Sequence, residues 1–206
     1  MHTVLTHPLV RHRVTLMRDI NTKPKQFREL VNEITQFLAI ESLKDLRTVE
    51  VPVTTPVAKT TGVKIEDSIV LVPILRAGMG MLDAMLHVLP YAKVGVLGMQ
   101  RNEQTAEPVP YYAKVPAAKG DELAIVIDPM LATGGSACDA FAQLKKLGYR
   151  RIVFLNLIAA PEGIARIQQD HPDVNIYVAA LDDHLNEHGY IVPGLGDAGD
   201  RLFGTK

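Results

Sequence analysis

The stretch Ile125–Ser136 constrains the fold of this chain more than any other. It reads Ile-Val-Ile-Asp-Pro-Met-Leu-Ala-Thr-Gly-Gly-Ser, an apolar run that ends in an acid and leads into a small loop. Apolar residues at helical spacing then begin at Phe141, and Gly148 ends the pattern. The order strand, loop, helix places the polar residues at the carboxyl end of a strand, which is the edge where open parallel sheets bind ligands.

The glycines of this loop suit a phosphate. Adjacent glycines allow a tight turn in which several backbone N–H groups converge, and the positive end of the following helix lies behind them. Asp128 is placed to accept hydrogen bonds from hydroxyl groups beside that phosphate, such as those of a ribose. The alternative is an ordinary strand-to-helix turn with Ser136 as the N-cap. The complete strand–acid–loop–helix pattern favours the phosphate site.

Composition narrows the class of protein. The 206 residues are 47% hydrophobic and 22% charged, which is typical of one soluble globular domain. The formal net charge is −1 and no block of lysine or arginine occurs, so the sequence argues against nucleic-acid binding. No apolar run reaches the roughly 20 residues that span a bilayer, and no signal peptide is visible, so we expect no membrane partner and a cytoplasmic location.

Metal and disulfide chemistry find little support in the sequence. The single cysteine, Cys138, excludes an internal disulfide framework and a cysteine-based zinc cluster, and we expect it to be buried in a helix. His184 and His188 are four residues apart but lack a third partner, which favours a solvated or capping pair over a metal site.

Strands and helices alternate over residues 68–180, which predicts an α/β fold with a doubly wound sheet. The run 68–75 is apolar throughout, as expected of a parallel strand buried on both faces. The expected strands are 68–75, 91–99 with Val94, Val96 and Leu97 as core candidates, 122–128, 151–159 and 174–180, and the expected helices lie near 81–89, 141–147 and 161–169.

The remaining segments are predicted from local patterns. A short helix starts near Pro8, and a long amphipathic helix covers 24–46 with its cap at Asn21-Thr22. Residues 48–61 form edge strands or a hairpin, and 99–121 form an extended hairpin or a mobile arm. The glycine-rich tail 190–201 carries too many apolar residues for a solvated segment, so we expect a folded loop over the carboxyl edge of the sheet.

These residues resemble a known family. The Ile125–Ser136 stretch is similar to the motif that binds 5-phosphoribosyl diphosphate (PRPP) in type I phosphoribosyltransferases, except that Pro129 stands where most members have a second acid. Asp-Pro-Met-Leu-Ala-Thr-Gly-Gly-Ser is similar to the uracil phosphoribosyltransferase branch in particular. Further resemblance to that branch lies in His7-Pro8-Leu9, Ile74–Gly78, Met99–Arg101 and Tyr190–Arg201, so it extends over almost the whole chain.

The resemblance implies one phosphoribosyltransferase domain over 1–206, with a mainly parallel sheet, flanking helices and a β-hairpin arm. It divides the chain into an N-terminal helical segment (1–47), a mobile arm (99–121) and a C-terminal hood (181–206) that binds the base. The implied reaction is uracil + PRPP → UMP + diphosphate, a step of pyrimidine salvage. The implied cofactor is Mg²⁺, which is carried by PRPP and not by a protein metal site.

The resemblance also assigns roles to residues. Asp128 would bind the ribose hydroxyls, Ala132–Ser136 would hold the 5′-phosphate, Arg76 would hold the diphosphate and Arg101 would close over it, because guanidinium groups suit phosphate oxygens. The catalytic residues would be Arg76, Arg101 and Asp128. The PRPP-binding residues would be Arg76, Arg101, Asp128, Pro129, Met130, Leu131, Ala132, Thr133, Gly134, Gly135, Ser136 and Asp197. The uracil-binding residues would be Ile191, Gly196, Asp197 and Ala198.

Several alternatives stay open at this point. Without the resemblance, Arg76 and Arg101 could each be a surface charge, and Asp200 is a candidate general base by location alone. Proteins of this fold also include regulators of transcription that bind PRPP or nucleotides, and enzymes for other bases. Family members form homodimers or larger homo-oligomers, for which the 24–46 helix and the 48–61 arm are candidate contacts, and some members respond to GTP as an allosteric effector.

Overall fold

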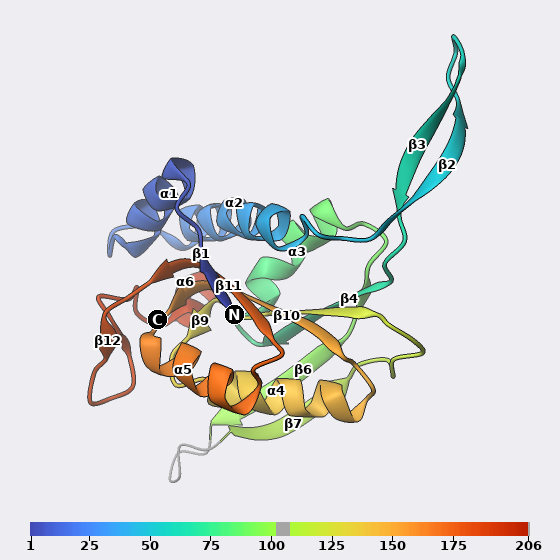
Figure 1. The fold of residues 1–206 in the computed structure, drawn as a ribbon. Coiled ribbons are helices and arrows are strands. Elements are labelled where there is room, and N and C mark those ends of the chain that lie inside the picture. Colours follow the sequence, from blue (N-terminus) through green and yellow to red (C-terminus); the bar gives the residue numbers. More distant parts are fainter. Residues whose placement is uncertain (102–107, 206) are drawn as a thin grey trace.

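The computed structural model describes residues 1–101 and 108–205, and side chains outside the range 99–110. Within these residues a nine-stranded, mainly parallel sheet forms the centre, with strand order β1-β11-β10-β8-β4-β6-β7, while β5 pairs with β4 and β9 pairs with β10 (Figure 1). Its strands are β1 (His2–Val4), β4 (Ile69–Leu75), β5 (Lys93–Val94), β6 (Val96–Arg101), β7 (Pro108–Lys114), β8 (Leu123–Ile127), β9 (Met130–Leu131), β10 (Arg151–Ala159) and β11 (Asn175–Leu181). The edge strand β1 was not predicted, because three residues are too few to show a period.

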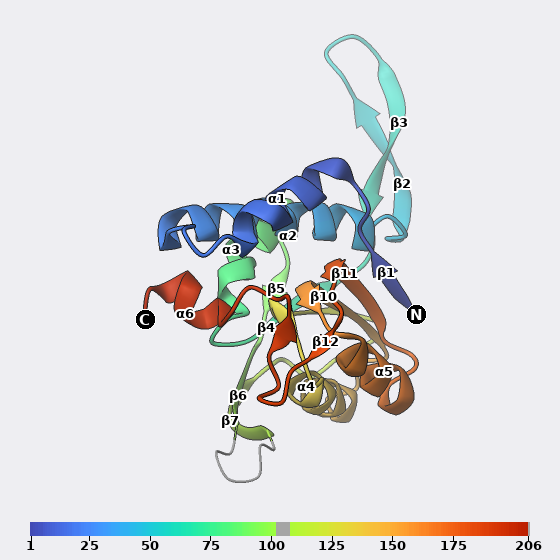
Figure 2. The same ribbon diagram turned by 90° about the vertical axis from the view of Figure 1, so that its left-hand side faces the viewer.

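Helices cover both faces of this sheet, which confirms the predicted doubly wound α/β fold. Figures 1 and 2 show α1, α2 and α3 on one face and α4 and α5 on the other. The bounds are α1 (Pro8–Arg18), α2 (Pro24–Ser42), α3 (Met79–Val88), α4 (Gly135–Lys146), α5 (Pro161–Asp170) and α6 (Ala198–Phe203). The short helix α6 was not predicted and lies in the C-terminal tail.

Two apolar clusters explain why the central strands are hydrophobic without alternation. Ile125 and Ile127 of β8 pack with α1, α2 and α3, whereas Ala124 and Val126 pack with α4 and α5. Successive side chains of a strand point to opposite faces, so a strand covered on both sides needs apolar residues at every position. Strand β8 lies in the middle of the seven-strand order and is buried throughout, as predicted.

The boundaries of the long helix differ from the prediction. It ends at Ser42 instead of near Leu46, and its N-cap is Lys23, whose side chain makes no capping hydrogen bond. The hydroxyl of Thr22 donates instead to the carbonyl of Leu16 (2.6 Å) and so belongs to the turn between α1 and α2. The hydroxyl of Thr22 is therefore used by the turn between α1 and α2 and does not cap the N-terminus of α2.

Two hairpins leave or extend the sheet. Strands β2 (Thr48–Thr54) and β3 (Lys59–Ile65) pair only with each other and project from the body, so the hairpin alternative is correct for this segment (Figures 1 and 2). Strands β6 and β7 form the predicted second hairpin. Val94, expected in the core, is 41% exposed because β5 is a two-residue strand, whereas Leu97 of β6 is fully buried.

A buried carboxylate anchors the base of the β2–β3 hairpin. Asp67 accepts hydrogen bonds from the backbone N–H of Arg47 (2.8 Å), from Arg47 Nε (2.8 Å) and from the guanidinium of Arg151. Its side chain is fully buried, whereas that of Arg47 is 47% exposed. The hydrogen bond from Arg151, followed by those from Arg47, holds the pKa of Asp67 well below its ordinary value of 3.8.

We expect Asp67→Asn to lower the free energy of unfolding by about 3 kcal/mol near neutral pH, because it leaves two arginines with a neutral partner. The folded pKa is depressed, so this stabilisation exists above about pH 4 and fades as the pH falls through the folded value. Urea unfolding of both proteins at neutral and acidic pH measures it. Asp173→Asn, which breaks the half-exposed pair with Lys145, is the control and should cost less than about 1 kcal/mol. Equal losses in the two variants would contradict the anchoring role.

Candidate functional site

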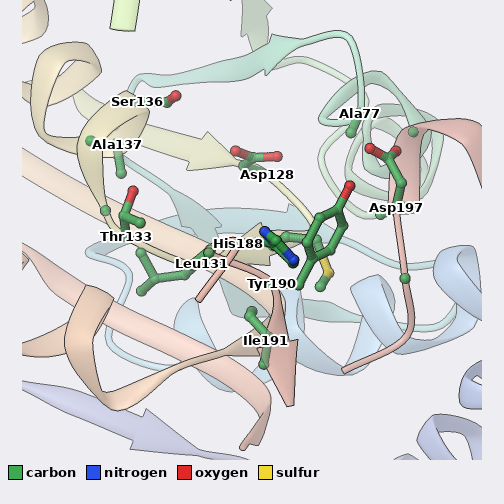
Figure 3. A pocket seen from close by; sticks show the side chains of 18 residues that line it. Ala77, Asp128, Leu131, Thr133, Ser136, Ala137, His188, Tyr190, Ile191 and Asp197 are labelled. Atoms are coloured by element: carbon green, nitrogen blue, oxygen red, sulfur yellow. The ribbon is translucent and has the colours of Figure 1, made fainter. Parts of the chain in front are cut away.

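A cavity of about 380 Å³ opens where the carboxyl ends of the central strands meet the C-terminal tail. Figure 3 shows Thr133 and Ser136 on one side of it, Ala77 and Asp197 on the other, and Asp128 between them. The lining residues are Ala77, Asp128, Met130, Leu131, Ala132, Thr133, Gly134, Gly135, Ser136, Ala137, His188, Gly189, Tyr190, Ile191, Gly196, Asp197, Ala198 and Gly199. The predicted phosphate loop and the predicted base-binding tail therefore face one space.

The first wall, the cradle, consists of Ala132–Ser136. Strand β8 ends at Ile127, β9 pairs with β10, and the chain then turns through Gly134 at φ 78° into α4. This positive φ suits glycine, and Gly134, not Ser136, is the N-cap of α4. The first N–H groups of α4 have no acceptor within the helix, so they can donate to an anion on the cavity side.

Helix α5 packs directly behind the cradle. A Cβ at Gly163 would lie 2.3 Å from the carbonyl oxygen of Ala132 and 2.8 Å from the side chain of Leu131, so only glycine permits this approach. Gly163 was not predicted as a site residue, because a glycine in the first turn of a helix carries no signal without knowledge of its neighbour.

Asp128 stands at the floor of the cavity, directly after β8. The backbone N–H of Met130 donates to its carboxylate, but burial outweighs this bond and raises the pKa of Asp128 from 3.8 to about 8. Its backbone carbonyl accepts a hydrogen bond from Asn156 Nδ2 (2.7 Å). Asn156 is fully buried in β10, and its Oδ1 has no hydrogen-bond partner among the described residues. Asn156 was not predicted as a site residue, although a lone asparagine in an apolar strand is a signal visible in the sequence.

The raised pKa of Asp128 predicts a pH dependence of stability. The folded protein keeps this proton up to about pH 8, whereas the unfolded chain releases it near pH 4, so ionisation of Asp128 destabilises the fold progressively over that range. The melting temperature of Asp128→Asn minus that of wild type should therefore rise from about pH 4 to about pH 8 and then level off. Thermal melts at steps of pH measure it, and a difference that stays flat would contradict the shifted ionisation.

The second wall is the hood. Strands β12 (His184–Leu185) and β13 (Ile191–Val192) pair antiparallel, and α6 follows with Asp197 as its N-cap. Asp197 Oδ1 accepts from the backbone N–H of Asp200 (2.9 Å), and the residue also faces the cavity. The predicted uracil contacts Ile191, Gly196 and Ala198 all line this wall, and the tail is folded over the carboxyl edge as expected.

Two further side chains on this wall were not predicted. Tyr190, which is 51% exposed, and His188 project beside Asp128 in Figure 3. Tyr190 precedes the apolar pair that anchors the tail, but nothing in its spacing distinguishes a cavity residue from a surface tyrosine. His184 and His188 are both exposed, and the described residues contain no group of three His, Cys, Asp or Glu that could hold a metal.

Two predicted residues, Arg76 and Pro129, do not lie on the cavity wall. Arg76 is 62% exposed and turns toward α6, with its guanidinium 4.0 Å from Asp200 and 5.6 Å from the ring centre of Phe203. Pro129 lies behind the wall, where its carbonyl accepts from Leu157 and Ile158. Arg101 ends β6, but its side chain lies outside the described residues.

Asp200 is also off this wall. It lines a second cavity, together with Arg18 and Arg201. Its Oδ1 accepts a hydrogen bond from the hydroxyl of Thr205 (2.5 Å).

Comparison of folds defines the class. The structure is similar to a hypoxanthine-guanine phosphoribosyltransferase from Bacillus anthracis, with a TM-score of 0.51 and 13% identity over 75% of this chain and 78% of that one. At this identity the likeness concerns the fold alone, which is that of the type I phosphoribosyltransferases. The AQ2163 protein from Aquifex aeolicus is much more similar, with a TM-score of 0.94, 41% identity and 98% coverage of both chains.

Comparison of sequences defines the family. The family model described as uracil phosphoribosyltransferase matches residues 4–205. Uracil phosphoribosyltransferases of Exiguobacterium sibiricum and Acholeplasma laidlawii are 55% and 54% identical to the chain, with 98% of each sequence covered in both comparisons. The chain belongs to the uracil phosphoribosyltransferase family, as the resemblance of its motifs implied.

Proposed function

We propose that this protein transfers the 5-phosphoribosyl group of PRPP to uracil, giving UMP and diphosphate, and so serves pyrimidine salvage. Membership of the family supports the activity, and one observation in the structure carries it. A phosphate cradle and a glycine-rich hood face each other across a single cavity with a carboxylate between them. A phosphorylated sugar and a flat base need this pairing of walls.

PRPP binds with its 5′-phosphate on the cradle and its ribose over Asp128. The N–H groups of Ala132–Ser136 and the hydroxyls of Thr133 and Ser136 are the donors, and Met130 and Leu131 complete the wall. The carboxylate of Asp128 accepts from the ribose hydroxyls. Arg76 and Arg101 remain our candidates for the diphosphate, and Arg76 would have to turn from Asp200 to reach it.

Uracil lies against the hood. It offers two carbonyl acceptors and N–H donors in one plane, which backbone groups of Ile191, Gly196 and Ala198 can complement. A side chain at Gly196 would point into open space, since no atom lies within 4 Å of an added Cβ. We assign Tyr190 to the same wall, where its ring would contact the base.

The reaction leaves little covalent work to the protein. The N1 atom of uracil forms a bond to the anomeric carbon while the bond from that carbon to diphosphate breaks, and the electron pair leaves with diphosphate. The uracil N–H proton is released in the same step. Positioning the two substrates, stabilising the leaving charge with arginine and excluding water are the protein's contributions. The 99–121 arm, whose residues 102–107 lie outside the described part of the chain, remains our candidate for a lid that excludes water.

The residues present fit a magnesium ion that arrives with PRPP. Mg²⁺ usually binds one or two carboxylates together with substrate phosphates, and Asp128 and Asp197 face the same cavity. When bound, the ion would neutralise charge on the departing diphosphate. Asp128 and Asp197 would hold it through their oxygens or through its water.

A homo-oligomer is our proposal for the assembly, with the β2–β3 hairpin as a contact. Val63 and Ile65 on this hairpin are 67% and 54% exposed, and the hairpin projects from the body (Figure 1). Exposed apolar residues on a projecting element favour contact with another chain. A GTP effector and a cytoplasmic location remain predictions. No helix within 1–101 and 108–205 combines the length and apolar character that a membrane crossing needs.

The deciding experiment is a base panel. Labelled uracil, cytosine, hypoxanthine and guanine are each incubated with PRPP, Mg²⁺ and the protein, and the nucleotide products are separated. UMP as the main product supports the proposal. Another nucleotide would identify an enzyme for that base, and the absence of any product would favour a regulator that binds without catalysing.

A further inference from the structure

The hood is fastened to the N-terminal segment by arginine side chains. Arg18, the last residue of α1, donates from Nη1 to Asp182 Oδ2 (2.7 Å) and to the carbonyl oxygen of Gly194 (2.7 Å). Its Nη2 donates to Asp182 Oδ1. One guanidinium therefore joins α1, the residue after β11 and the loop that leads into the cavity wall.

Asp182 binds both Arg18 and the loop at Gly194. It follows β11, is only 7% exposed, and its Oδ2 also accepts from the backbone N–H of Gly194 (2.8 Å). The pair therefore binds both backbone polar groups of Gly194. Arg18 donates to its carbonyl oxygen, and Asp182 accepts from its N–H. A paired buried carboxylate of this kind holds its partners in one geometry.

A second arginine fixes the next residue of the same loop. Arg201 of α6 donates to the carbonyl oxygens of Leu195 (2.9 Å) and Asp19 (2.6 Å). Its guanidinium lies 4.4 Å from the ring centre of Phe27 in α2. Gly194 is therefore held by an arginine of α1, and Leu195 is held by an arginine of α6 that also contacts Asp19 and Phe27 of the N-terminal segment.

External bonds restrain this loop, which contains two glycines in left-handed backbone conformations. Gly194 and Gly196 have φ values of 60° and 81°, and glycine loses more conformational freedom on folding than other residues. Gly196, Asp197 and Ala198 follow directly and form the cavity wall opposite the cradle. A shift of Gly194 would move that wall, while the cradle and Asp128 stand on β8 and α4 and would stay in place.

We propose that Arg18 and Asp182 are positioning residues whose ion pair sets the place of the hood and thereby the affinity for the base. The inference rests on the proposed function, since it takes the hood as the uracil wall. Neither residue lines the cavity of the candidate site. The pair therefore acts on the base through Gly194 and the loop that follows it.

Helix α1 offers a matched control. Arg13 lies on the same helix, its side chain is 23% exposed like that of Arg18, and it pairs with Glu33 of α2. Among the described residues Arg13 bonds to Glu33 and to the carbonyl of Leu9 and lies over the ring of Phe37, all outside residues 181–205. Arg13→Ala therefore removes a guanidinium of equal exposure without releasing the hood. A general loss of stability would affect both variants alike.

The test is steady-state kinetics of wild type, Arg18→Ala, Asp182→Asn and Arg13→Ala with uracil and PRPP, with thermal melts of each. We expect the KM for uracil to rise about tenfold in Arg18→Ala and Asp182→Asn and the KM for PRPP to rise by a clearly smaller factor, since of the described PRPP contacts on the cavity wall only Asp197 belongs to the hood. Arg13→Ala should have the same KM for uracil and the same KM for PRPP as wild type. Arg18→Lys keeps the positive charge but loses the paired N–H groups of the guanidinium, so its KM for uracil should lie between those of wild type and Arg18→Ala.

The outcomes separate this inference from the proposed function. If wild type forms no UMP, the proposed function fails. If wild type is active and the uracil KM of Arg18→Ala equals that of Arg13→Ala, or if the KM values for uracil and PRPP rise by the same factor, the positioning role is overturned. If Arg18→Ala does not fold, Arg18→Lys and Asp182→Asn are compared with wild type instead. An unchanged KM for uracil in both of these variants would overturn the proposal.

Discussion

Asp128→Asn is expected to lower kcat/KM for PRPP by about 100-fold or more while the fold is retained. The amide keeps the shape of the side chain but cannot ionise, whereas the carboxyl of Asp128 can release its proton and carry the negative charge once the ribose hydroxyls and the metal ion of PRPP are bound. The same change removes a carboxylate whose pKa burial raises to about 8, so the variant should melt no lower than wild type at neutral pH. Loss of turnover together with undiminished stability separates a role in the site from a role in folding.

Steady-state kinetics with PRPP varied and thermal melts at the same pH check this result. Asp83→Asn is the control, because Asp83 is exposed on α3 and takes the same substitution away from the cavity. Wild-type turnover in Asp128→Asn would remove Asp128 from the ribose site. An equal loss in Asp83→Asn would point to a general effect of charge.

Ala198→Val is expected to raise the KM for uracil more than about tenfold and to leave PRPP binding intact. Ala198 lines the cavity wall of the hood and is 3% exposed, so two added methyl groups have little free space beside the bound base. Overpacking of this kind also costs about 1–3 kcal/mol of stability, which the experiment must separate from the effect on uracil.

The control is Ala179→Val in β11, since Ala179 has the same 3% exposure but lies away from the cavity. Both variants should lose stability, and only Ala198→Val should lose affinity for uracil. PRPP binding is followed by the rise in melting temperature that PRPP causes. If Ala198→Val converts uracil with a normal KM, Ala198 does not belong to the base pocket.

Local patterns in the sequence predicted most of the central fold. Strand β8 is buried on both faces, and its uninterrupted apolar run predicts this burial. The turn from Asp128 to α4 was also predictable, because adjacent glycines and the start of a helical period are neighbours in the chain. The same patterns could not place Val94, whose burial depends on a strand that stops after two residues.

The arginine bonds to the hood lie beyond any local pattern. Arg18 and Asp182 are 164 positions apart, and Arg201 and Asp19 are 182 positions apart. A lone arginine at the end of a helix resembles any residue that favours the helix dipole. Only the fold shows that these side chains meet, and that they meet at the loop before the cavity wall.

The loop Ala132–Ser136 could be predicted from the sequence as a phosphate site, because the backbone N–H groups of a glycine turn converge without any partner distant in the chain. The sequence therefore predicted a phosphate site at this loop and a tail folded over the carboxyl edge of the sheet. The tertiary structure decided which residues face each other across the cavity. It also turned Arg76 toward Asp200 and buried Asp128 enough to raise its pKa. The physical reason is that orientation, burial and charge pairing are set by groups far apart in the chain, which meet only after folding.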